Sequence, residues 1–319
     1  MKMAKDVVVG FVGLGTMGGK MATNLLKAGY KVVVHDLHRQ AASHHLQEGA
    51  EWADTPRALA EKSDVILSSL PEPADVERVA LGADGLLEGV KKGAAYFDLS
   101  TNSQSVVKKI SAAFAARGAT MLDAPVSGGP SGAASRKMAI WVGGDRAAFD
   151  KHKPVLDAMG DRAAYIGPVG TATVAKLVHN MSSYAVTAAL AETFTMGVKA
   201  GVDPVALWEA VRQGVSGRRL TFDGLLEQFL PGKYDPPNFA LKLATKDVTL
   251  ATSLGRELGV PMRICNLTHA EMVEASNRGW EGRDSRVMML LQEERAGVKI
   301  ASDPERIKQA AERAKAGGA

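Results

Sequence analysis

Three glycines near the start of the chain have the spacing of a phosphate-binding loop, in the segment Gly13-Leu14-Gly15-Thr16-Met17-Gly18. The segment follows an apolar, β-branched run at 7–12 and precedes a helical pattern at 18–28. In such loops the first glycine permits a tight turn, the second lets the backbone approach a pyrophosphate, and the third allows close packing of helix on strand. The N-terminus of the helix adds unpaired N–H groups and a positive dipole. The sequence therefore predicts that residues 13–18 bind a dinucleotide.

An acidic residue at the end of the next predicted strand indicates which dinucleotide is bound. Asp36 follows the run at 31–35, about 20 residues after the glycines, where such folds place the carboxylate that binds the adenosine ribose. Its charge repels a 2′-phosphate, so the sequence favours NAD. His38 and Arg39 follow closely and could pair with such a phosphate, which leaves NADP as the second candidate.

Three polar side chains share one face of a long helical stretch predicted from about residue 170 to 200. Lys176, His179 and Asn180 stand at i, i+3 and i+4, positions that are neighbours on a helix surface. A partly desolvated lysine has a lowered pKa and can exchange a proton with a substrate hydroxyl. Taken alone, a lysine on a helix is more often a solvated surface charge. His179 could either bind a substrate hydroxyl or make a contact in the core.

Several motifs, in the same order along the chain, resemble the β-hydroxyacid dehydrogenase family, which includes 3-hydroxyisobutyrate dehydrogenase, tartronate semialdehyde reductase and L-threonate dehydrogenase. The resemblance implies hydride transfer between a nicotinamide and a small β-hydroxy acid or its semialdehyde, with Lys176 as the general acid/base. It covers roughly residues 7–295. The motifs are the glycine segment from Gly10 to Gly18, Asp98-Leu99-Ser100-Thr101, Asp123-Ala124-Pro125-Val126-Ser127-Gly128-Gly129, Lys176 with Asn180, and Phe239 with Lys246-Asp247.

The resemblance also assigns residues to the substrate and to the cofactor. The substrate residues share small or polar side chains, and backbone N–H groups at the glycines suit a carboxylate. The substrate set is Ser127, Gly128, Gly129, His179 and Asn180, and the cofactor set is Gly13, Leu14, Gly15, Thr16, Met17, Gly18, Asp36, Leu70, Pro71, Thr101, Phe239 and Lys246.

Other assignments stay open at the level of sequence. Arg218 and Arg219 could recognise a second anionic group of the substrate, or they could be solvated charges. Asp284 lies in a motif whose role could be structural. An imine reductase on the same scaffold and a catalytically silent dinucleotide-binding module are the alternative functions. Lys176 argues against both, because such proteins replace or lose this lysine.

The distribution of strand and helix patterns predicts an α/β Rossmann domain, a doubly wound parallel sheet, followed by an all-α domain that a long interdomain helix joins to it. We expect the boundaries 1–168, 169–300 and a charged C-terminal tail at 301–319. The strands are predicted at 7–12, 31–35, 65–69, 95–99, 120–124 and 138–143, and the helices of the second half at 170–200, 204–213, 220–229, 241–258, 264–278 and 287–294.

The bulk composition excludes several classes of protein. With 319 residues and a net charge of +4, the chain lacks the clustered basic stripe of a nucleic-acid binder. Cys265 is the only cysteine, so we expect a reducing compartment, the cytoplasm, and no disulfide. No cluster of ligands predicts a metal, and no apolar run predicts a membrane span. The apolar helices of the second half suggest a homodimer or homotetramer.

Overall fold

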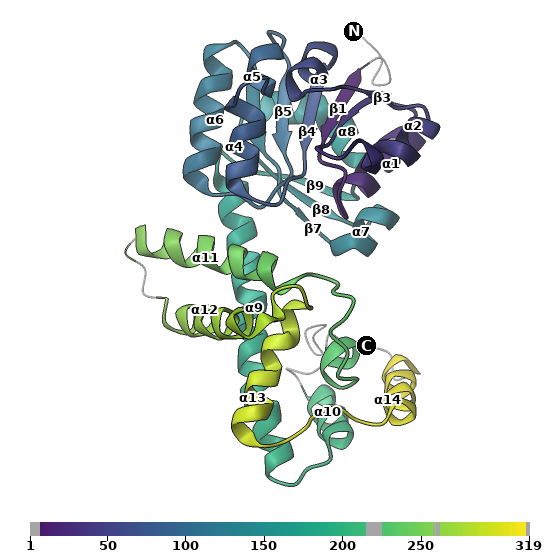
Figure 1. Ribbon diagram of the computed structural model, residues 1–319, viewed down its shortest axis with the longest axis vertical. Helices are drawn as coiled ribbons and strands as arrows, with labels where there is room; N and C mark the ends of the chain where they lie inside the picture. The colour runs from purple at the N-terminus through teal and green to yellow at the C-terminus, as the bar shows by residue number, and fades with distance from the viewer. Residues whose placement is uncertain (1–6, 215–224, 258, 260–261, 317–319) are drawn as a thin grey trace. The chain divides into compact units, whose positions relative to one another are not determined.

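The computed structural model describes residues 7–214, 225–257, 259 and 262–316, and the chain divides into two units, Met1–Leu177 and Val178–Ala319 (Figure 1). The division falls inside the long helix α9, Thr171–Lys199, so that the start of this helix belongs to the first unit and the rest to the second.

Within the described residues, a nine-stranded sheet forms the centre of the first unit, in the order β3-β2-β1-β4-β5-β6-β8-β7, with β9 paired to β8. Strands β1 to β6 run parallel, and the chain reverses its direction of winding between β1 and β4, which is the hallmark of a doubly wound sheet. The strands are β1 Val8–Val12, β2 Lys31–His35, β3 Glu51–Trp52, β4 Val65–Ser68, β5 Ala95–Asp98, β6 Thr120–Asp123, β7 Val126–Ser127, β8 Ala139–Gly143 and β9 Arg162–Gly167.

Two apolar cores, one on each face of the sheet, hold the helices in place. Successive side chains of a strand point to opposite faces, so Phe11 of β1 belongs to one core while Val12 belongs to the other. Helices α1 and α8 pack on the first face, and α3, α4 and α6 on the second (Figure 1). The helices of this unit are α1 Gly18–Lys27, α2 Ser43–Gln47, α3 Pro56–Lys62, α4 Pro73–Leu81, α5 Leu86–Gly89, α6 Gln104–Ala116, α7 Gly129–Ser135 and α8 Arg146–Asp157.

The far edge of the sheet differs from the expected purely parallel arrangement. Strand β8 pairs antiparallel with both β6 and β7, and parallel with β9. Strands β3 and β7 have two residues each, and β9 alternates exposed and half-buried residues. The two-residue strands β3 and β7 are too short to show the apolar runs from which the other six were predicted.

The second unit is helical, as the sequence predicts. Its helices are the main part of α9, then α10 Pro204–Gln213, α11 Leu241–Glu257, α12 Arg263–Ala275, α13 Met289–Ala296 and α14 Pro304–Ala316, with π-helical turns at Leu225–Phe229 and Ser276–Trp280 and a 3₁₀ turn at Ser285–Met288. In the part of the chain that the structure describes, no helix combines the length and apolar character needed to cross a bilayer.

A buried histidine on α8 makes the stability of the first unit dependent on pH. His152 is 5% exposed, its ring lies 6.2 Å from that of Phe97, and burial lowers its pKa from 6.5 to about 4, with a smaller contribution from Lys151. Protonation therefore favours the unfolded chain, so this contribution to stability is present above pH 6.5 and is lost as the pH falls toward 4.

We expect His152→Gln to remove this pH dependence. Between pH 7 and pH 5 the histidine should lower the free energy of unfolding of the wild type by about 2 kcal/mol. Urea unfolding of both proteins at pH 7 and pH 5 gives the loss of unfolding free energy of each. Subtracting the loss in the variant from the loss in the wild type cancels the titration of the other groups. Equal losses in wild type and variant would show that His152 titrates normally in the folded chain.

Candidate active site

The three glycines of the first motif differ in the space around their backbone. Gly13 has a φ of 89°, and a Cβ there would lie 2.3 Å from the carbonyl oxygen of Ser69. A Cβ on Gly18 would lie 1.9 Å from the carbonyl oxygen of Gly13. Gly15 differs, because a Cβ there would have no described atom within 4 Å. The fold therefore requires the first and third glycines, while the second leaves space beside the backbone at the start of α1.

Asp36 is joined to this loop by hydrogen bonds. The backbone N–H of Leu14 donates to its Oδ2 at 2.7 Å, and that of His38 donates to Oδ1 at 2.9 Å. The N–H of Gly13 donates to the carbonyl oxygen of His35 at 2.9 Å. The end of β2 and the glycine loop are thus fixed to each other, with the carboxylate at their junction.

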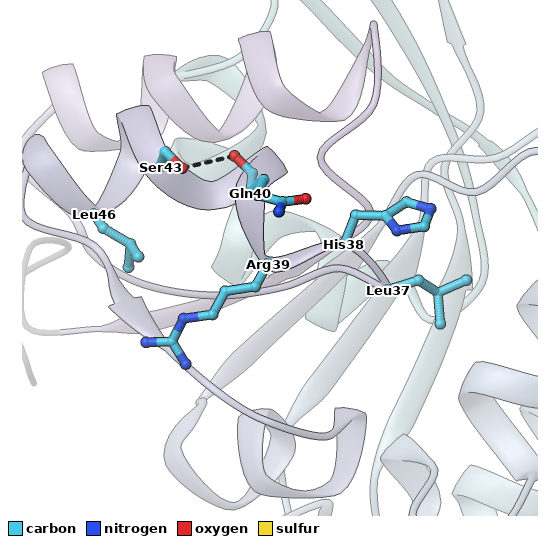
Figure 2. A pocket seen from close by; sticks show the side chains of 6 residues that line it. All are labelled: Leu37, His38, Arg39, Gln40, Ser43 and Leu46. Atoms are coloured by element: carbon cyan, nitrogen blue, oxygen red, sulfur yellow. Dashed lines mark hydrogen bonds between the residues drawn. The ribbon is translucent and has the colours of Figure 1, made fainter.

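The residues that follow Asp36 in the chain line a surface hollow of about 420 Å³. Figure 2 shows the side chain of Arg39 extending away from those of His38 and Leu37. The Arg39 guanidinium lies 5.3 Å from the centre of the Trp52 ring and 3.8 Å from Asp54. Both charges of this pair are largely exposed, so the pair contributes little to stability. The lining residues are Leu37, His38, Arg39, Gln40, Ser43 and Leu46.

A buried carboxylate at the end of β5 organises two of the expected cofactor loops. Asp98 Oδ1 accepts hydrogen bonds from the Ser68 hydroxyl at 3.0 Å and the Ser100 N–H at 3.1 Å, and Oδ2 accepts from the Asn102 amide at 2.8 Å. The Ser100 hydroxyl in turn accepts from the Leu70 N–H at 2.9 Å. Burial raises the pKa of Asp98, and these hydrogen bonds oppose the rise. Residues 70–71 and 100–102 are therefore held through one side chain.

The segment expected to bind the substrate carboxylate is a strand end followed directly by a helix. Ser127 ends β7 and is half-buried, and Gly129 begins α7. Gly128 has a φ of 152° and Gly129 a φ of 62°, conformations that residues other than glycine rarely adopt. Both glycines are exposed, so their backbone is accessible to a ligand.

Lys176 lies in the first unit, near the start of α9, and is half-buried. His179, exposed, and Asn180, 9% exposed, lie one turn further along the helix, in the second unit. The first unit thus contains the glycine loop, the 127–129 segment and Lys176.

Asn180 is oriented by a buried ion pair of the second unit. Its amide nitrogen donates to Asp247 Oδ2 at 2.5 Å, and Lys246 Nζ lies 2.9 Å from Asp247 Oδ1. The side chain of Asp247 is 2% exposed and that of Lys246 13% exposed. Because a carboxylate only accepts hydrogen bonds, the amide of Asn180 turns its nitrogen toward Asp247 and its carbonyl oxygen away from it.

Asp284 anchors the loop that carries Phe239. It is 1% exposed, and its Oδ2 accepts from the Asn238 N–H at 3.0 Å while its Oδ1 accepts from the Arg286 N–H at 3.0 Å. The Ser285 N–H donates to the carbonyl oxygen of Phe239 at 2.8 Å. The side chain of Phe239 is 38% exposed. Arg218 and Arg219 lie outside the described residues.

Two family models together match most of the chain. The NAD binding domain of 6-phosphogluconate dehydrogenase matches residues 8–167, and the NAD-binding domain of NADP-dependent 3-hydroxyisobutyrate dehydrogenase matches residues 170–291. The two matches meet at the start of α9.

Full-length relatives share both parts of the chain. A 3-hydroxyisobutyrate dehydrogenase of Pseudomonas aeruginosa is 38% identical over 76% of this chain and 83% of its own length. A 2-(hydroxymethyl)glutarate dehydrogenase of Eubacterium barkeri is 33% identical over 93% of this chain and 99% of its own. The crystal structure of a 3-hydroxyisobutyrate dehydrogenase from Salmonella typhimurium superimposes with a TM-score of 0.80 at 31% identity, covering 90% of this chain and 100% of that one.

Proposed function

Because the chain belongs to the β-hydroxyacid dehydrogenase family of NAD(P)-dependent oxidoreductases, we propose that it interconverts a small β-hydroxy acid and its semialdehyde with Lys176 as the general acid/base. The observation that carries the proposal is that one chain combines the glycine loop after β1 with a half-buried Lys176 in the second turn of α9. The space beside Gly15, between two glycines that the fold requires, suits a pyrophosphate.

The roles of the side chains follow from the direction of proton movement. When bound, the nicotinamide supplies the acceptor for the hydride that leaves the carbinol carbon. During alcohol oxidation the neutral amine of Lys176 takes the hydroxyl proton, and during reduction the ammonium returns it.

We assign recognition of the substrate to the residues that suit an anion and a hydroxyl. The exposed backbone at Gly128 and Gly129, with the hydroxyl of Ser127, suits the carboxylate. His179 and Asn180 suit the hydroxyl groups. Thr101, Leu70, Pro71, Phe239 and Lys246 are assigned to the cofactor, three of them on loops that Asp98 holds and one on the loop that Asp284 anchors.

A spectrophotometric panel tests the proposal. The purified chain, with NAD or NADP, is assayed against 3-hydroxyisobutyrate, glycerate, threonate, 3-hydroxypropionate and sulfolactate, and in the reverse direction against cyclic imines. We expect turnover with at least one β-hydroxy acid and none with the imines. Reduction of imines alone would assign a different reaction to the site, and cofactor binding without any turnover would assign a silent binding module.

NAD is the proposed cofactor because Asp36 places a carboxylate at the glycine loop, where it suits a ribose diol and repels a 2′-phosphate. We expect Asp36→Asn, which removes the charge and keeps one acceptor for the Leu14 N–H, to lower the ratio of kcat/KM for NAD over NADP about tenfold or more. Arg39→Ala is the comparison variant. It removes a charge three residues after Asp36, from a side chain that contacts Trp52 and Asp54. An unchanged ratio in Asp36→Asn would contradict the assignment.

The second unit is the proposed site of self-association, as a dimer or a tetramer. Helices α9 and α12 carry exposed apolar side chains, among them Val178 at 61%, Ile264 at 61% and Leu267 at 66% exposure. Large exposed apolar side chains favour association when a second copy covers them. Light scattering coupled to size-exclusion chromatography measures the mass in solution, and a monomer at all concentrations would contradict the proposal.

A further inference from the structure

A second buried carboxylate, at the end of β6, holds the first turn of α9. Asp123 is 1% exposed. Its Oδ1 accepts from the Gly170 N–H at 2.7 Å, and its Oδ2 accepts from the N–H of Thr173 at 2.7 Å and from the Thr173 hydroxyl at 2.9 Å. Three donors at the start of one helix therefore converge on a single side chain.

This cap differs from the others in the first unit by its origin in the sheet. The first N–H groups of a helix have no partner inside the helix and are usually satisfied by the residue that precedes it. Asp145 does this for α8, where it accepts from the Ala148 N–H at 2.7 Å. Asp123 instead precedes α9 by about 50 residues, so its hydrogen bonds fix the helix to strand β6.

The surroundings leave the Asp123 carboxylate little freedom. Asp123 stands in register between Asp98 of β5 and Gly143 of β8. A Cβ on Gly143 would lie 2.6 Å from Asp123 Oδ1 and 2.9 Å from the carbonyl oxygen of Pro168. Burial raises the pKa of Asp123, and the hydrogen bonds from Gly170 and Thr173 oppose the rise. The carboxylate is thus enclosed and held by the groups that it orients.

Lys176 follows Thr173 by three residues, or about one turn of α9. A helix that is fixed at its first turn has its axial position and its rotation set there, and both determine where the next turn directs its side chains. We propose that Asp123 is a positioning residue for Lys176, and that its hydrogen bonds to Gly170 and Thr173 set the geometry of proton transfer. This inference rests on the proposed role of Lys176.

The test compares three variants in the full-length chain. Asp123→Asn keeps the shape of the side chain but turns an amide N–H group toward one of the donors. Thr173→Val removes only the hydroxyl donor. Asp145→Ala removes the cap of α8, a helix with no residue assigned to substrate or cofactor, and serves as the control for loss of an aspartate helix cap.

For Asp123→Asn we expect kcat to fall about 10- to 100-fold, because small misplacements of a reacting group have effects of this size. We expect the KM for NAD to change less than about twofold, because the glycine loop is not touched. Amide hydrogen exchange should become faster at Gly170 and Thr173. Thr173→Val should show a smaller fall in kcat with the same unchanged KM, and Asp145→Ala should lose stability and keep its kcat.

The outcomes separate this inference from the function on which it rests. Activity retained in Lys176→Ala would remove the proposed function itself. If Lys176→Ala is inactive while Asp123→Asn keeps a wild-type kcat, or if Asp145→Ala loses as much kcat as Asp123→Asn, the inference is wrong and the function stands. If Asp123→Asn does not fold, Thr173→Val decides: a lower kcat at unchanged KM supports the positioning role, and an unchanged kcat overturns it.

Discussion

Replacing Lys176 with alanine should lower kcat about 10²- to 10⁴-fold, which is the usual contribution of a positioned general acid or base. The dissociation constant for NAD should stay within about twofold of the wild type, because the side chain is assigned to the proton and not to the dinucleotide. Steady-state kinetics with the best substrate of the panel give kcat, and isothermal titration calorimetry with NAD gives its dissociation constant.

A second lysine of the same helix provides the control. Lys199 lies in the last turn of α9, is exposed, and donates to the carbonyl oxygen of Ala296. Lys199→Ala should keep both constants at wild-type values. Equal activity in Lys176→Ala and Lys199→Ala would remove Lys176 from the mechanism.

Gly15→Ala should abolish most cofactor binding while leaving the fold intact. A Cβ at Gly15 has no described atom within 4 Å, so the substitution creates no clash in the chain itself. The added methyl group would instead occupy the space that the backbone offers to a pyrophosphate. We expect the dissociation constant for NAD to rise about 100-fold or more, a loss of roughly 3 kcal/mol, with the melting temperature unchanged.

Substitutions at two other glycines serve as controls for this result. Gly282→Ala also meets no described atom within 4 Å and should change neither stability nor affinity. Gly18→Ala would bring a Cβ to 1.9 Å from the Gly13 carbonyl oxygen and should destabilise the first unit itself. A normal affinity in Gly15→Ala would show that the pyrophosphate does not pass over this residue.

The strands and helices that the sequence predicts correctly are those that a local pattern of apolar and capping residues determines. The six strands with apolar runs lie in the structure within a residue of their predicted bounds. The sequence-based helix at 204–213 is reproduced as α10, Pro204–Gln213, because Asp203 caps it and Pro204 suits its first position. Strand β9, Arg162–Gly167, was not predicted, although it contains a short apolar run from Ala163 to Ile166.

Three aspartates named in the sequence motifs, but given no catalytic or binding role there, act through contacts that sequence spacing does not show. Asp98, Asp123 and Asp284 each accept backbone N–H groups from a loop or helix turn, and for Asp123 and Asp284 the partners are separated by about 45 to 50 residues. Spacing cannot reveal such pairs. One signal was available: Asp98 and Asp123 each close a strand of otherwise buried residues, and a carboxylate in that position needs hydrogen-bond donors.

The position of Arg136 illustrates a limit of reading glycine patterns. Arg136 ends α7 with a φ of 63°, a left-handed conformation that favours glycine. Its guanidinium donates to the carbonyl oxygen of Asp157 at 3.1 Å, which stabilises the arginine in this conformation. The residue type alone gave no indication of this turn.

Chemical rescue of Lys176→Ala by small primary amines is the most direct test of the claim that an amine at this position carries the proton. We predict that methylamine and ethylamine restore oxidation of the β-hydroxy acid in proportion to the concentration of the neutral amine, while tetramethylammonium restores nothing. An inactive variant that binds NAD normally and that no amine rescues at any pH would contradict the assignment of proton transfer to Lys176.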